Sequence, residues 1–101
     1  MTTEFINSLK EKTKAAKENL ENDIITDISQ YDSELMKKME EAAEQGYNFV
    51  HAQYGLPIKY EVIKDKLKSI ITSYYERPDL EIKIRIIDNI LMFSYDITIV
   101  W

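Results

Sequence analysis

The segment LEIKIRIIDNILMFSYDITIVW, residues 80–101, decides the fold. Apolar and polar side chains alternate on both sides of Asp88-Asn89, which is the pattern of a β-hairpin with one buried face and a two-residue type I′ turn. A turn at this dipeptide sets the register of the two strands. The expected pairs on the apolar face are Ile86–Leu91, Ile84–Phe93, Ile82–Tyr95 and Leu80–Ile97, and those on the polar face are Arg85–Met92, Lys83–Ser94 and Glu81–Asp96.

Residues 47–78 supply the rest of a small sheet domain. Branched and aromatic residues from Tyr47 to Tyr54 predict a strand, which Gly55-Leu56-Pro57 stops. A helix should follow, begin near Pro57 and end before Pro78. A strand–helix–strand step favours parallel strands. We therefore expect an α+β domain over residues 29–101, with helices on one face of a three-stranded mixed sheet.

The first half of the chain is predicted to be helical, with one ambiguous stretch. One long bent helix is compatible with the spacing in residues 22–29, and a break near Asn22-Asp23 or Thr26-Asp27 with Ser29 as the next cap is the alternative. We favour two helices, the second of which ends at Gln45 with Gly46 as a left-handed cap. Residues 1–28 then form an N-terminal helical extension.

Composition and charge exclude several classes of protein. The 101 residues are 45% hydrophobic and contain no cysteine, so we expect one modest core and no disulfide or thiolate chemistry. Residues 1–46 hold 6 basic and 11 acidic side chains, whereas residues 47–101 hold 7 of each. This acidity argues against direct nucleic-acid binding and leaves an acidic surface for a basic partner.

The chain shows no sign of export or membrane insertion. Its first thirty residues lack the apolar core of a signal peptide, and no apolar run approaches the roughly 20 residues of a membrane span. We expect a cytoplasmic protein without membrane contact.

No catalytic, metal or phosphate motif is present. His51 is the only histidine, so we expect it to hydrogen-bond a strand neighbour and not to bind a metal. Two glycines cannot build a phosphate-binding loop. Lys83 and Arg85 should neutralise the facing Glu81 and Asp96 as a surface ladder. We therefore predict no enzyme activity, cofactor or metal.

Two sets of residues are candidates for protein contacts. Heptad-like spacing in the first helix gives a thin apolar stripe, which we expect to need a partner. Tyrosines near element ends either form a binding edge or close the core. The candidate oligomer interface consists of Ile6, Leu9, Ala16, Leu20 and Trp101, and the candidate partner-binding residues are Glu40, Glu41, Glu44, Tyr47, Tyr54, Tyr60 and Tyr75.

A helix ending in Ala42-Ala43-Glu44-Gln45-Gly46 is followed by a short strand, a second helix and a hairpin that closes on Ile99-Val100-Trp101. From Glu40 onward this order resembles small uncharacterised proteins of tailed bacteriophages. The chain departs from their pattern where Tyr75-Glu76-Arg77-Pro78 replaces the usual Gly-Tyr before the hairpin, and where Val100 replaces a serine before the closing tryptophan. The resemblance implies a phage origin and carries no functional residues with it.

These observations predict a small, non-enzymatic protein-binding module. If the phage resemblance holds, it acts in the bacterial host cytoplasm as an inhibitor of a host protein or defence complex. The alternative is a structural component of a virion or other assembly, in which the first helix docks on a neighbouring chain. A third hypothesis is a homo-oligomeric sponge with small-ligand pockets between subunits.

Overall fold

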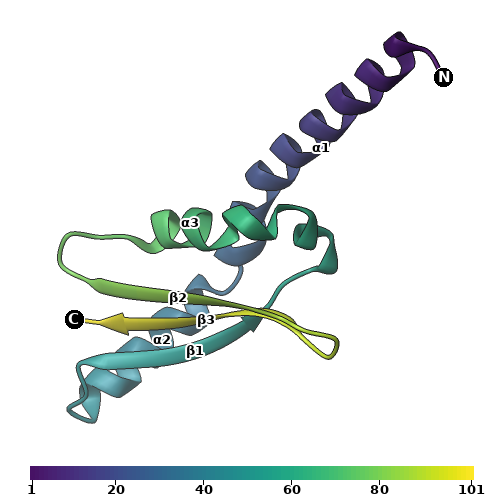
Figure 1. The fold of residues 1–101 in the computed structure, drawn as a ribbon. Coiled ribbons are helices and arrows are strands. Elements are labelled where there is room, and N and C mark those ends of the chain that lie inside the picture. The colour runs from purple at the N-terminus through teal and green to yellow at the C-terminus, as the bar shows by residue number, and fades with distance from the viewer.

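The computed structural model describes residues 1–101 and has the expected α+β class (Figure 1). Two helices come first and are followed by a strand, a third helix and a hairpin, which confirms the predicted order of elements. The helices are α1 (Thr3–Ser29), α2 (Asp32–Glu44) and α3 (Lys64–Tyr75), with a short 3-10 helix η1 (Ile58–Ile63) before α3, and the strands are β1 (Phe49–Gly55), β2 (Glu81–Asp88) and β3 (Phe93–Val100).

The sheet is antiparallel, so the expectation of a mixed sheet is wrong. The strand order is β1-β3-β2, and both outer strands run antiparallel to β3. β1 and β2 are therefore parallel to each other, as the intervening helix requires, but β3 lies between them. β3 has the most buried side chains of the three strands, because the strand at the centre of a sheet is covered by a neighbour on each side.

The register of the hairpin differs from the predicted one by four residues. Asp88 pairs with Phe93, so the loop has four residues instead of two. The Asn89 side chain accepts a hydrogen bond from the Leu91 N–H at 2.9 Å and supports this longer loop. An even shift keeps every side chain on its predicted face. It changes the partners, however, and Glu81 lies opposite Val100 instead of Asp96.

The helices cover one face of the sheet and enclose the core. α2 packs against β1 and α3 packs against β2 (Figure 1). Both helices lie on the predicted face, because Ile84 is buried there and Ile82, Phe93 and Leu80 pack against the same cluster. The central strand contributes most to this cluster, through Tyr95, Ile97 and Ile99.

The break between the first two helices lies later than predicted. α1 continues to Ser29 because Ile24 and Ile28, four residues apart, are both fully buried. This burial outweighs the capping tendency of Asn22 and Asp23. The division of the chain at residues 28/29 stays a prediction about folding units, but the last turns of α1 are packed in the core of residues 29–101.

The end of α2 is as predicted. Gly46 has φ +92°, the left-handed conformation that glycine adopts without steric cost. The N–H of Gly46 donates to the Ala43 carbonyl at 3.0 Å, and the N–H of Tyr47 donates to the Ala42 carbonyl at 2.9 Å. These two bonds form a Schellman motif, which turns the chain into β1. None of the helices offers an apolar stretch long enough to cross a bilayer.

Candidate functional site

The first part of α1, residues 3–19, projects from the body of the protein into solvent (Figure 1). We call this part the projecting helix. It is about 25 Å long at 1.5 Å per residue. Every residue in it is exposed except the half-buried Ser8. The Thr2 hydroxyl caps its start by accepting the Phe5 N–H at 3.1 Å.

Side-chain contacts to η1 and α3 hold the base of the projecting helix. The Tyr60 hydroxyl donates a hydrogen bond to the Asp27 carboxylate, which lies in the last turns of α1. Lys66 Nζ lies 2.9 Å from Glu21 Oε1 and joins α3 to the same helix. The direction in which α1 leaves the body is therefore set by residues of η1 and α3 that lie far away in sequence.

The predicted apolar stripe lies along the projecting helix and is uncovered. Ile6 and Leu9 are 39% and 46% exposed, and Ala16 is also exposed. Leu20 is half-buried because it packs against the core where the helix reaches the body. The stripe therefore begins in solvent and continues into the core.

Lysines border this stripe, although the sequence interpretation did not include them among the binding residues. A spacing of four and three residues places Lys10, Lys14 and Lys17 along one side of the stripe. These lysines, Ile6 and Leu9 line a shallow hollow of about 670 Å³ that runs along the helix, and Glu18, Glu21 and, from α3, Lys66 border its end nearest the body. Lys12 lies on the other side of the stripe. The spacing of four and three residues between Lys10, Lys14 and Lys17 could have predicted from the sequence that basic side chains flank the stripe.

The acidity of the first half is concentrated away from the projecting helix. Residues 21–46 hold eight acidic side chains and two lysines, whereas residues 3–19 hold three glutamates and four lysines. Glu40, Glu41 and Glu44 are all exposed near the end of α2. They form a solvated acidic surface, and Tyr47 just beyond them is 52% exposed.

The other candidate tyrosines do not form a binding edge. Tyr54 and Tyr60 are 5% and 0% exposed, so both belong to the core, and this part of the expectation is wrong. Tyr75 is half-buried, and its hydroxyl lies 3.0 Å from that of Tyr95. Burial raises the pKa of Tyr54 to about 12 and also raises the pKa values of Tyr60 and Tyr95. These phenols remain neutral at pH 7 and close the core.

Trp101 is partly covered by its own chain. Its backbone N–H donates to the Asn48 carbonyl at 2.9 Å, so the last residue extends the β1–β3 pairing. The side chain is 36% exposed. A role for Trp101 at an oligomer interface remains a prediction.

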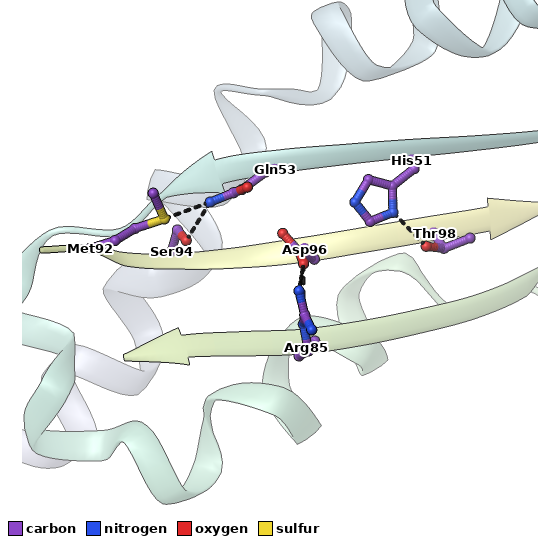
Figure 2. Close-up of polar contacts among 7 residues, drawn as sticks. All are labelled: His51, Gln53, Arg85, Met92, Ser94, Asp96 and Thr98. Carbon is purple, nitrogen blue, oxygen red and sulfur yellow. Dashed lines mark hydrogen bonds and ion pairs between the residues drawn. The ribbon is translucent and has the colours of Figure 1, made fainter. Parts of the chain in front are cut away.

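The uncovered face of the sheet carries a row of polar side chains (Figure 2). Arg85 lies opposite Asp96 and donates to Asp96 Oδ2 from Nη2 at 2.6 Å and from Nε at 3.2 Å. Asp96 is only 6% exposed, and its Oδ1 has no hydrogen-bond partner. The expected like-charge pair of Glu81 and Asp96 is therefore replaced by a direct ion pair.

His51 belongs to the same row (Figure 2). Its Nδ1 lies 3.0 Å from the Thr98 hydroxyl directly across the strands, which confirms the predicted contact with a strand neighbour. Gln53 donates to the Ser94 hydroxyl at 3.1 Å. Each member is engaged by its cross-strand or diagonal neighbour, so the row stabilises the sheet through side-chain pairs.

The polar row does not bring together the groups of a metal centre. No three His, Cys, Asp or Glu side chains of the chain come close enough to hold an ion. The projecting helix, by contrast, carries exposed apolar side chains that a partner could cover, so we take it as the candidate site. No protein-family model, curated protein or solved structure matches the chain, and the phage resemblance stays a prediction.

Proposed function

We propose that this protein is a non-enzymatic protein-binding module that docks through its projecting helix. The observation that carries the proposal is the uncovered stripe of Ile6 and Leu9 on a helix surrounded by solvent. Most of the stability of helices in proteins comes from tertiary packing of an apolar face, and the apolar face of this part of α1 is not packed. A partner that covers the stripe would supply this packing.

The lysines beside the stripe specify the chemistry of the partner. If two copies of the projecting helix paired along the stripe, Lys10, Lys12 and Lys17 would lie at the positions that flank the seam. Lysines of one copy would face lysines of the other in the parallel and in the antiparallel arrangement. We infer that the partner is a helix of another protein, with an apolar stripe flanked by Asp or Glu.

The phage resemblance would place this activity in an infected cell. The partner would then be a host protein or defence complex, and the chain would act as its inhibitor. The alternative is a structural component of a virion, in which the same stripe docks on a neighbouring chain. A virion component would be present in purified particles, whereas an inhibitor would be found only in infected-cell lysate.

Two synthetic peptides test the choice of partner. Both form amphipathic helices with the same Ile/Leu stripe, but one has Glu and the other Lys at the flanking positions. We expect the Glu peptide to bind the full chain in a fluorescence anisotropy titration and the Lys peptide to bind at least tenfold more weakly. High salt should reduce this difference, because exposed charges are screened.

Two aspartate variants locate the contact. Leu9→Asp places a charge in the stripe, and Ala15→Asp places the same charge on the opposite, exposed side of the same helix. Binding of the Glu peptide should be lost in the first variant and kept in the second. The proposal is wrong if neither peptide binds or if Leu9→Asp binds like the unmodified chain. Light scattering that shows a dimer lost on Leu9→Asp would replace the foreign partner by a second copy.

A further inference from the structure

A cavity of about 370 Å³ opens in the helical layer, on the same face of the sheet that α2 and α3 cover. The two helices pack against opposite edge strands, and the cavity lies between them. Leu35 and Ile99 line it and are 3% and 2% exposed, so they form its closed, apolar floor. The volume lies at the lower end of the roughly 300–1,000 Å³ typical of small-molecule sites.

The wall of the cavity is apolar and deformable. Met36 is 67% exposed at the mouth, and Met39 and Leu80 are half-buried beside it. Methionine is unbranched and adapts to ligands of irregular shape. Such a lining favours a flexible hydrocarbon over a polar molecule, because the Asp32, Tyr74 and Tyr75 side chains at the cavity are already engaged in hydrogen bonds.

One charged group at the cavity has no partner. The Asp32 carboxylate accepts a hydrogen bond from the Tyr74 hydroxyl, and the Tyr75 hydroxyl is paired with Tyr95. Arg77 also lines the cavity and is exposed, but it forms none of the ion pairs of the chain. A guanidinium presents a planar fork of donors that matches a carboxylate.

We propose that this cavity binds a small amphipathic carboxylate, whose hydrocarbon part fills the space between α2 and α3 and whose carboxylate contacts Arg77. A saturated chain of medium length suits the volume and needs no hydrogen bond from the wall. The site shares no residue with the projecting helix. It therefore goes beyond the proposed function, and each proposal can fail without the other.

The four methionines of the chain make a direct assay. With ¹³C-methyl methionine, Met36 and Met39 report on the cavity, whereas Met1 and Met92 lie outside its lining and serve as internal controls. Titration with octanoate should move the Met36 and Met39 signals saturably and leave the other two in place. Hexanoate should bind about 16-fold more weakly, because each buried CH₂ contributes about fourfold in affinity.

Matched ligands and one variant test the role of the charge. Octanol and octylammonium keep the hydrocarbon but replace the carboxylate by a neutral and a cationic group. We expect octanoate to bind about tenfold more tightly than octanol, as for a hydrogen bond to a charged group that is partly screened by water. Arg77→Gln should remove this preference and leave octanol binding unchanged.

Several results would overturn the proposal. Equal movement of all four methionine signals would mean non-specific association, and an absence of saturation would mean that there is no site. Octylammonium binding as tightly as octanoate, or an Arg77→Gln variant that keeps the full preference, would remove the role of Arg77. Met36 and Met39 signals that depend on protein concentration without ligand would mean that a second copy of the chain fills the cavity.

Discussion

Two isoleucine-to-alanine replacements in α1 should differ strongly in their effect on stability, although both lie on the same helix. Ile28 is 0% exposed, so Ile28→Ala removes three buried carbon atoms. The lost transfer free energy is about 2.4 kcal/mol at about 0.8 kcal/mol per carbon. The cavity left behind adds about 1 kcal/mol. We expect Ile28→Ala to lower the free energy of unfolding by about 3–4 kcal/mol.

Ile6 is 39% exposed and packs against no core residue. Alanine also has a higher helix propensity than isoleucine by a few tenths of a kcal/mol. We therefore expect Ile6→Ala to change the free energy of unfolding by less than about 0.5 kcal/mol, as is usual for exposed positions. The same variant should weaken binding of the Glu-flanked peptide, because it removes part of the stripe.

Urea unfolding of both variants measures these effects. The fluorescence of Trp101, the only tryptophan, reports on the sheet, and far-ultraviolet circular dichroism reports on the helices. A loss below about 1 kcal/mol for Ile28→Ala would mean that the end of α1 is not packed in the core. A loss above about 1 kcal/mol for Ile6→Ala would mean that the projecting helix is already covered, by its own chain or by a second copy.

Three other predictions concern the sheet, a buried tyrosine and the glycines. Arg85→Met should cost about 2 kcal/mol in urea unfolding, because it leaves the buried Asp96 carboxylate without its charged side-chain donor, and unchanged stability would contradict this. Burial raises the pKa of Tyr54 to about 12, above its value of about 10 in the unfolded chain, so the contribution of Tyr54 to stability should be constant below pH 10 and fall until it is lost as the pH rises through 12. Tyr54→Phe should make this fall smaller in urea titrations at several pH values, and an identical fall would refute the assignment. An added Cβ meets no atom within 4 Å at Gly46 or at Gly55, but only Gly46 has a positive φ, +92°. Gly46→Ala should therefore lower the thermal midpoint through a cost of about 1 kcal/mol, whereas Gly55→Ala should not, and equal shifts would exclude a backbone cause.

The alternation in residues 80–101 is enough to predict which side chains face the helices. It is not enough to predict the cross-strand pairs, because a shift of four residues leaves both faces unchanged. The pairs depend on the loop, and the side-chain bond of Asn89 supports a loop longer than the dipeptide suggests. The ion pair of Arg85 and Asp96 follows from that register and was therefore missed.

Two predictions were wrong for different reasons: the position of the break between the first two helices, and the placement of Tyr54 and Tyr60 at a binding edge. Local capping tendencies near Asn22 are weaker than the burial of Ile24 and Ile28, which only the folded chain reveals. Tyr54 and Tyr60 lie near element ends, where an amphipathic side chain suits either an edge or a core. Tyr54 lies on the same face of β1 as Val50 and Ala52, since the three are two residues apart, and this alternation could have predicted that Tyr54 belongs to the core.

The stripe on the projecting helix is the part of the candidate site that the sequence predicts best. Its spacing is local, and Ile6 and Leu9 need no tertiary contact to lie on one side of a helix. The direction of that helix, by contrast, depends on Tyr60 and Lys66, which contact α1 across more than thirty residues of sequence. The cavity beside Arg77 likewise exists only when α2, α3 and β3 are assembled.

The central place of β3 also determines when the sheet can form during synthesis. β1 has no strand to pair with until residues 93–100 have been made, and β2 has none either, because neither outer strand touches the other. During synthesis on the ribosome, α1 and α2 can therefore become helical before any backbone hydrogen bond between strands forms, because each such bond involves β3. The sheet is consequently the last part of the fold to form: a nascent chain that stalls in the loop at residues 89–92 has no sheet against which its helices can pack.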